Sequence, residues 1–143
     1  MRVVGVDFGG TRIGIAVGET EPEVASPRAA IKASGTLRVD AGQIKDIFSK
    51  EMATAVVVGL PLGSEGEDTK MSKVCRKLGE EIAKLGCPVH YVDEAFTSIN
   101  ATAHLRDHDW TAATRRKHID SEAACQILER FFRVIKDANG GQS

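Results

Sequence analysis

Three acidic residues that are far apart in the sequence could do chemistry together, and the first is Asp7. It lies between Val6 and Phe8 in an apolar, strand-like run, where aspartate is uncommon. A buried carboxylate is costly unless a partner compensates its charge. A bound cation would compensate it, and so would hydrogen bonds from the backbone amides of the turn over residues 9–11. Asp7 is therefore a candidate metal ligand with a structural alternative.

The second and third acids also lie at the ends of predicted elements. Glu94 follows Asp93 at the carboxyl end of a predicted strand, where ligands bind in α/β sheets, although acids there also cap a following helix. Asp120 directly precedes the helix predicted over residues 121–135, as a helix cap does. Asp120 also lies four residues before Ala124, on the buried face of that helix, and this position favours a site.

Together, Asp7, Glu94 and Asp120 are typical of a site for a hard cation. The cysteines have no CxxC spacing and the histidines no metal-ligand spacing, so carboxylate oxygens are the available donors. Such donors suit Mg²⁺ or Mn²⁺ rather than zinc. Divalent ions held in this way catalyse phosphoryl transfer, one by lowering the pKa of an attacking water and the other by stabilising the leaving oxygen. We therefore expect the three acids to be both metal ligands and catalytic residues.

Two clusters of basic residues could hold a phosphate backbone beside these acids. The formal net charge is −1, so binding of nucleic acid has to depend on local clusters rather than on the charge of the whole chain. The alternative for each cluster is a solvated helix face. The clusters are Arg115, Arg116 and Lys117, shortly before Asp120, and Lys70, Lys73, Arg76 and Lys77, after the polar loop over residues 64–68.

The pattern of apolar residues predicts the elements that position these side chains. Apolar and small residues alternate over 12–18, as in a strand, and the valine-rich run 54–60 is typical of a strand covered on both faces. The predicted strands are 2–8, 12–18, 25–31, 54–60 and 88–93, and the predicted helices are 37–51, 69–86, about 97–107 and 119–137. This order predicts a three-layer α/β domain around a five-stranded mixed sheet, with three antiparallel strands, then two parallel ones, and helices on both faces.

The length and composition predict one domain. The chain has 143 residues, and we expect a single domain over 1–137 and a flexible C-terminal tail over 138–143. The longest apolar run, residues 55–60, is far shorter than the roughly 20 residues that span a bilayer. The N-terminus does not resemble a signal peptide. We expect the three cysteines to be free thiols in a reducing environment, and hence a cytoplasmic protein with no membrane partner.

Four segments give the chain a resemblance to the YqgF/RuvX family of pre-16S rRNA nucleases and Holliday-junction-resolvase-like proteins. The segments are VVGVDFGGTRIGIAVG, VVGLPLGSEGEDT, VDEAFTS and KHIDSEAACQILERFF, and the resemblance covers about residues 2–136. It implies an RNase H-like fold and a cytoplasmic, bacterial-type protein. It also implies an acidic triad at Asp7, Glu94 and Asp120, and a role in maturing the 5′ end of 16S rRNA.

The same resemblance implies further substrate-binding residues and two departures from the family pattern. Arg12 matches an arginine of the first motif, which we expect near phosphate, and residues 59–63 match a loop on the substrate side. With the basic clusters, the expected substrate-binding residues are Arg12, Gly63, Lys70, Arg115, Arg116 and Lys117. Family members usually carry arginine and asparagine where this chain has Ala95 and Gly63. These departures weaken the expected hold on the substrate but not on the metal.

The sequence therefore predicts a nuclease, with other functions left open. The prediction is a phosphodiesterase that uses Mg²⁺ or Mn²⁺ on structured nucleic acid, with precursor 16S rRNA as the leading substrate. One alternative is a Holliday junction resolvase acting on branched DNA, which would need a dimer. Another is a non-catalytic RNA-binding assembly factor, suggested by Ala95 and Gly63. A kinase half is a further alternative, because DFGGT resembles the first phosphate loop of actin-like sugar kinases, but the chain is too short for the second lobe. The oligomeric state, monomer or homodimer, is left open.

Overall fold

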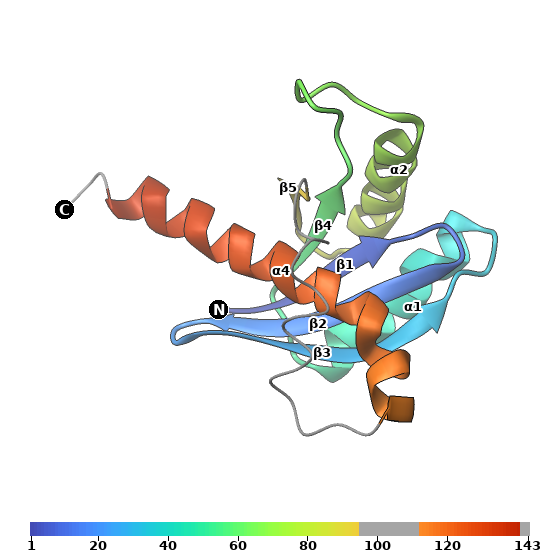
Figure 1. Cartoon of the computed structure of the whole chain (residues 1–143), viewed down its shortest axis with the longest axis horizontal. Helices are drawn as coiled ribbons and strands as arrows, with labels where there is room; N and C mark the ends of the chain where they lie inside the picture. Colours follow the sequence, from blue (N-terminus) through green and yellow to red (C-terminus); the bar gives the residue numbers. More distant parts are fainter. Residues whose placement is uncertain (95–111, 141–143) are drawn as a thin grey trace.

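The computed structural model describes the backbone of residues 1–94 and 112–140 and the side chains of residues 1–94 and 121–137. Figure 1 shows the whole fold. Within these ranges the predicted strands and helices are confirmed to within two residues at each end, except for the last helix. The elements are β1 (Arg2–Phe8), β2 (Arg12–Thr20), β3 (Glu23–Lys32), α1 (Leu37–Lys50), β4 (Ala55–Leu60), α2 (Lys70–Lys84), β5 (Val89–Asp93) and α4 (Ala112–Gly140).

The five strands form one mixed sheet in the order β3-β2-β1-β4-β5. β1 pairs antiparallel with β2, and β2 pairs antiparallel with β3. β4 is parallel to β1, and β5 is parallel to β4. The predicted sheet is thus confirmed, and the strand that carries Asp7 is its central strand.

Helices cover both faces of the sheet, as predicted. α1 and α2 pack on one face and α4 packs on the other (Figure 1). In β4, Val56 and Val58 belong to the core beneath α1 and α2, whereas Val57 belongs to the core beneath α4. All three are fully buried, which is why β4 is apolar at successive positions instead of at alternate ones.

The last helix begins earlier than the sequence predicts. α4 starts at Ala112, seven residues before the predicted start at 119. Residues 112–118 are mostly good helix formers, but they lack the apolar periodicity from which the start was predicted. Asp120 therefore lies inside the helix, and its interpretation as a helix cap is wrong. The helix continues to Gly140, into the predicted tail, and the predicted helix at 97–107 lies outside the described residues.

α4 lies directly against the backbone of the sheet because two strand residues have no side chain. A Cβ added to Gly5 of β1 would lie 2.9 Å from the carbonyl oxygen of Ala124 and 2.7 Å from Cγ of Leu128. A Cβ added to Gly18 of β2 would lie 2.8 Å from Cζ of Phe132. α4 thus runs across the sheet from the end where β1 stops to the end where β1 starts.

The part of the chain that the structure describes offers no sign of a membrane span or a disulfide. No described helix is both long and apolar enough to cross a bilayer. Cys75, Cys87 and Cys125 are all buried and free, as the sequence predicts.

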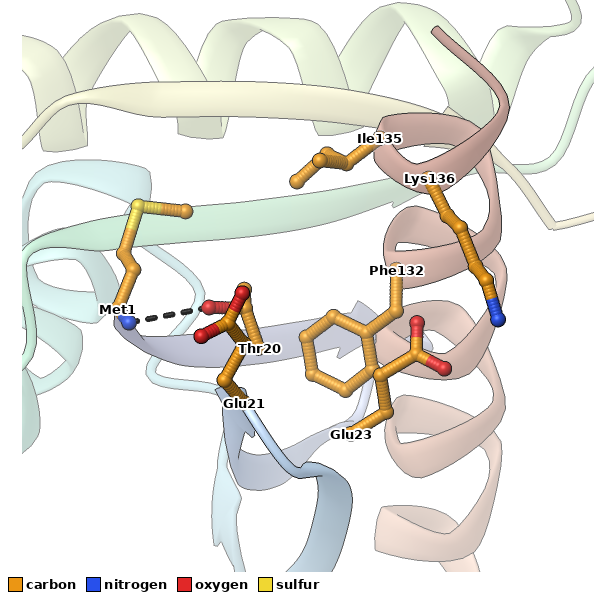
Figure 2. Close-up of a pocket in the computed structure, with 7 residues that line it drawn as sticks. All are labelled: Met1, Thr20, Glu21, Glu23, Phe132, Ile135 and Lys136. Atoms are coloured by element: carbon orange, nitrogen blue, oxygen red, sulfur yellow. Dashed lines mark hydrogen bonds between the residues drawn. The ribbon is translucent and has the colours of Figure 1, made fainter. Parts of the chain in front are cut away.

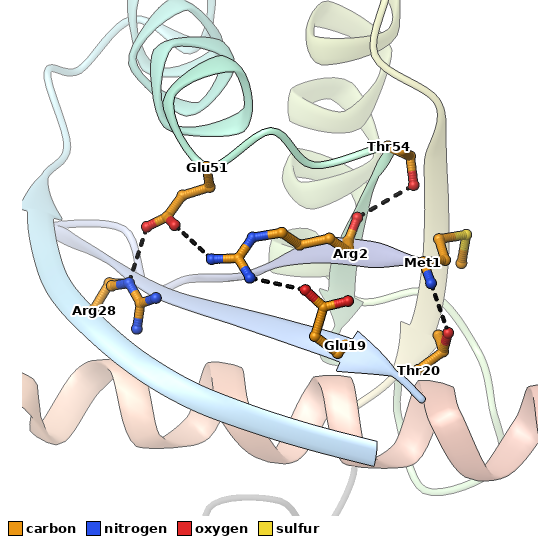
Figure 3. Close-up of polar contacts among 7 residues, drawn as sticks. All are labelled: Met1, Arg2, Glu19, Thr20, Arg28, Glu51 and Thr54. Carbon is orange, nitrogen blue, oxygen red and sulfur yellow. Dashed lines mark hydrogen bonds and ion pairs between the residues drawn. The ribbon is translucent and has the colours of Figure 1, made fainter. Parts of the chain in front are cut away.

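An ion-pair network joins the start of β1 to the neighbouring strands and to the end of α1 (Figure 3). Arg2 donates hydrogen bonds of 2.8 Å to Glu19 of β2 and 2.8 Å to Glu51. Arg28 of β3 donates through Nε to the other oxygen of Glu51, at 3.0 Å. The hydrogen bonds from Arg28 and then Arg2 lower the pKa of Glu51 below its ordinary value of 4.5.

We expect Glu51→Gln to destabilise the protein by about 1 kcal/mol near neutral pH, as partly exposed ion pairs do. Because the pKa of Glu51 is lowered in the folded state, its contribution is present above pH 4.5 and is lost as the pH falls through the folded pKa. Urea unfolding of the wild type and of Glu51→Gln, at pH 7 and near pH 3, measures the difference in stability. A difference that persists unchanged at the lower pH would contradict the assignment.

Candidate active site

Asp7 and Glu94 come together at one end of the sheet, although 86 residues separate them. Asp7 lies near the end of β1, and Glu94 directly follows β5, two strands away in the sheet. The backbone amide of Glu94 donates a 3.0 Å hydrogen bond to the carbonyl of Leu60, which continues the pairing of β5 with β4 beyond Asp93. The side chains of Glu94 and Asp7 share a hydrogen bond. Two of the three predicted acids therefore form a pair.

The surroundings of this acid pair favour a protonated Glu94. Burial, and next the negative charge of Asp7, raise the pKa of Glu94 from 4.5 to about 9. Protonated Glu94 accordingly donates the shared hydrogen bond, and the Asp7 carboxylate accepts it. The pair thus holds one proton between two carboxyl groups at neutral pH.

Among the described residues, the available metal ligands at this end of the sheet are carboxylate oxygen atoms. Cys75 of α2 is fully buried. Burial, followed by the negative charges of Glu94 and Asp7, raises its pKa to about 12. Cys75 therefore stays a thiol, which is a poor metal ligand. Carboxylate oxygens without thiolate fit Mg²⁺ or Mn²⁺ and not a soft metal.

Arg12 lies beside Asp7, at the other end of the β1–β2 turn. A small cavity of about 170 Å³ is lined by Asp7, Gly9, Thr11 and Arg12. Gly10, at φ +91°, makes the tight turn possible, and the amide of Gly9 donates to the carbonyl of Arg12 at 2.9 Å. The cavity combines an acid with an arginine, as a subsite for a cation and a phosphate group would.

The backbone around Asp120 is fixed at the same end of the sheet. The hydroxyl of Ser121, the next residue of α4, accepts a 3.0 Å hydrogen bond from the amide of Ile15 in β2. The β2–β3 pairing shifts register between Ile13 and Ile15. Gly14, between them, pairs with Asp7 across β1 and β2. Ser121, the neighbour of Asp120, thus contacts Ile15, and Ile15 is the neighbour of Gly14, the residue paired with Asp7. The side chain of Asp120 lies outside the described residues.

We expect Ser121→Ala to destabilise the protein by about 1–3 kcal/mol, because it leaves the buried amide of Ile15 without its acceptor. Ser121 is fully buried, so water cannot easily replace the hydroxyl. Amide hydrogen exchange resolved by residue tests this: exchange at Ile15 should accelerate in the variant. Unchanged exchange at Ile15 would argue against the hydrogen bond.

Of the other predicted substrate-binding residues, Gly63 and Lys70 lie between the carboxyl end of β4 and the start of α2, and the rest have side chains outside the described residues. Gly63 lies in the loop after β4, and its amide donates to the carbonyl of Glu67 at 2.8 Å. A Cβ at Gly63 would overlap the Glu67 carboxylate, so Glu67 occupies the space that a side chain at 63 would fill. Lys70 is exposed at the first position of α2.

The start of α2 lies close to the β1–β2 turn. A Cβ at Gly10 would lie 3.6 Å from the methyl carbon of Met71. Of the basic residues on α2, Arg76 already has partners, because its Nε donates to Asp68 at 3.0 Å and its guanidinium lies 5.9 Å from the centre of the Tyr91 ring. Arg115, Arg116 and Lys117 fall within α4, and their side chains lie outside the described residues, as does Ala95.

The described residues alone do not complete a metal site. Among them, no three His, Cys, Asp or Glu side chains come close enough together to hold a metal ion. The side chain of the third predicted ligand, Asp120, lies outside the described residues. The structure thus brings Asp7 and Glu94 together, and the joint role of the three acids as metal ligands stays a prediction.

Two residues shape this site in ways that the sequence does not predict. Ser121 fixes the position of α4 on β2, and Gly59 of β4 lies beside the Glu94 carboxylate. The resemblance places Gly59 in a loop on the substrate side but does not predict its contact with Glu94, and nothing in the sequence distinguishes Ser121 from a surface serine.

A second cavity lies at the opposite end of the sheet and takes no part in this site. It has a volume of about 530 Å³ and includes Met1, whose ammonium group donates to Thr20 at 3.0 Å (Figure 2). Met1 is six residues from Asp7 along β1, or about 20 Å in an extended strand. The cavity is lined by Met1, Thr20, Glu21, Glu23, Phe132, Ile135 and Lys136.

The sheet order, the covering helices and the acid pair define the class as RNase H-like. The structure is similar to that of Thermus thermophilus RuvC solved in complex with a Holliday junction substrate, with a TM-score of 0.53, 15% identity and coverage of 94% of this chain and 96% of that chain. This similarity shows the fold.

The sequence matches the family RuvX, described as Holliday junction resolvase, over residues 1–134. It is 32% identical over 133 residues to a "Putative pre-16S rRNA nuclease" of Maridesulfovibrio salexigens, covering 92% of this chain and 98% of that protein. It is 34% identical over 134 residues to a protein of the same description from Hydrogenovibrio crunogenus, covering 93% and 94%. The chain belongs to the RuvX family and is a nuclease of that family.

Proposed function

We propose that the chain is a Mg²⁺- or Mn²⁺-dependent phosphodiesterase that cleaves precursor 16S rRNA in the cytoplasm. The observation that carries the proposal is the meeting of Asp7 and Glu94 at the carboxyl ends of β1 and β5. The descriptions of the relatives from Maridesulfovibrio and Hydrogenovibrio support RNA as the substrate.

Each residue has a role in this proposal. Asp7, Glu94 and Asp120 hold the cations, and their oxygen donors suit ions that need hard ligands. Divalent cations held by these residues would supply an activated water and would neutralise charge on the leaving oxygen. Arg12 binds the phosphate beside Asp7, since the two residues line one cavity. Lys70, Arg115, Arg116 and Lys117 hold neighbouring phosphates.

The loop after β4 contributes backbone groups to the substrate side. Gly63 has no side chain, so this loop presents only backbone groups to the RNA at position 63, and the Glu67 carboxylate lies where a side chain at 63 would begin. Ala95 removes a positive charge that the family usually has. We therefore propose a weaker hold on the substrate than in relatives that have both side chains.

A second candidate is a Holliday junction resolvase acting on branched DNA. The description of the RuvX family and the RuvC structure with its junction favour it. A resolvase cuts two strands and needs two active sites, so this candidate requires a homodimer.

Cleavage assays on two substrates test the proposal. The purified protein is incubated with a 5′-extended 16S rRNA fragment and with a four-way DNA junction, each with Mn²⁺ and with EDTA. We expect Mn²⁺-dependent cutting of the RNA only. Cutting of the junction alone, by a dimer, would support the resolvase. RNA binding that is equal in EDTA, with no cutting in Mn²⁺, would indicate a non-catalytic assembly factor.

A further inference from the structure

We propose that Gly59 is a positioning residue of the active site: the missing side chain on β4 leaves the space in which the Glu94 carboxylate reaches Asp7. The inference rests on the proposed role of the acid pair. It explains why glycine occupies the penultimate position of a strand that is otherwise apolar and fully buried.

The register of the sheet places Gly59 between the two acids. β4 lies between β1 and β5, and Val58 pairs with Val6, so Gly59 lies level with the next residue of β1, Asp7. On the other side, Gly59 pairs with Val92, two residues before Glu94. The two carboxyl groups therefore meet across β4.

The alternation of side chains puts Gly59 on the same face as both acids. Val57 and Val92 belong to the core beneath α4, as does Val3. Side chains two positions apart in a strand point to the same face. Gly59 and Glu94 follow Val57 and Val92 by two residues, and Asp7 follows Val3 by four, so all three face α4.

A side chain at Gly59 would occupy space that Glu94 uses. A Cβ there would lie 2.6 Å from Oε2 of Glu94, and it would also overlap Cδ1 of Ile127 in α4. Carbon and oxygen atoms do not approach so closely without a bond, so one of the neighbours has to move. The Glu94 carboxylate is the end of a flexible side chain and can move at little cost in stability, but moving it takes it away from Asp7.

Gly59→Ala is the variant that tests this inference, and two more variants distinguish the positioning of Glu94 from the packing of α4 on the sheet. Ile127→Val removes Cδ1, so in the Gly59→Ala background it relieves the closest contact with residue 127, keeps the 3.0 Å contact with Cγ1 and leaves the overlap with Glu94. Gly5→Ala is the matched control, because its Cβ would press on α4 at Leu128 and Ala124, and Glu94 is not among its close neighbours.

Crystal structures and Mn²⁺ titrations of the wild type, the double variant and Gly5→Ala test the inference, together with melting temperatures of these three proteins and of Gly59→Ala. We expect Gly59→Ala/Ile127→Val to recover part of the melting temperature lost in Gly59→Ala, yet to bind Mn²⁺ at least about tenfold more weakly than the wild type, as loss of a supporting contact does. In its metal-free structure, Glu94 should no longer reach Asp7. Gly5→Ala should lower the melting temperature and keep the Mn²⁺ affinity.

A double variant whose Glu94 still bonds Asp7 would overturn the inference, whatever its metal affinity. The proposed function is tested separately by the wild type. If the wild type binds no Mn²⁺, the cation-dependent function fails, while the metal-free structures still decide whether Gly59 positions Glu94.

Discussion

Asp7→Asn should reduce cleavage of the precursor RNA about a thousandfold while leaving RNA binding within about twofold of the wild type. The amide keeps the shape of the carboxylate but removes the charge that holds a cation, and a thousandfold corresponds to about 4 kcal/mol of transition-state stabilisation. Single-turnover cleavage in Mn²⁺ and filter binding in EDTA measure the two quantities.

The matched control for this variant is Asp46→Asn, which makes the same chemical change on the exposed face of α1. It should cut at the wild-type rate. If Asp7→Asn also cuts at the wild-type rate in a preparation free of other nucleases, the assignment of Asp7 to the cation site is wrong.

Glu94→Gln should abolish cleavage and at the same time stabilise the metal-free protein by about 1–3 kcal/mol at pH 8. Burial and the charge of Asp7 raise the pKa of Glu94 to about 9 in the folded state. Between pH 4.5 and about pH 9, Glu94 loses its proton in the unfolded chain but keeps it in the folded chain. Glu94 therefore makes the folded state progressively less stable as the pH rises. Glutamine carries no such proton and can still donate to Asp7.

Unfolding by urea in EDTA, at pH 8 and at pH 4, measures this effect. The gain in stability should be present at pH 8 and should vanish near pH 4, where Glu94 is protonated in both states. A variant that is less stable than the wild type at pH 8 would mean that Glu94 is a structural acid with favourable partners. Gain of stability with loss of activity is typical of residues retained for function.

The mixed sheet could be predicted because its pattern is local. The alternation of β2 indicates a strand with small residues on one face, and the continuous apolar run of β4 indicates a strand with large apolar residues on both faces. The position of Asp7 near Glu94 followed from the same prediction, since the carboxyl ends of parallel strands meet at one edge of the sheet.

The start of α4 could not be predicted in this way, and neither could the contacts by which Ser121 and Gly59 position the site. Residues 112–118 form a helix without an apolar stripe, so periodicity gives no signal there. Ser121 and Gly59 act through tertiary contacts, one with the amide of Ile15 and the other with the Glu94 carboxylate. Such contacts depend on the register of the strands and on the distance between the helix and the sheet, and the sequence pattern specifies neither.

The central claim is that Asp7, Glu94 and Asp120 jointly hold divalent cations, and the most direct test is a crystal structure of the wild type grown in Mn²⁺ with anomalous data. The account predicts an anomalous peak with oxygen atoms of Asp7 and Glu94 at about 2.1 Å, the distance of hard cations of this size, and with Asp120 completing the shell. Crystals that diffract well and show Asp7 still bonded to Glu94, with no Mn²⁺ between them, would contradict it.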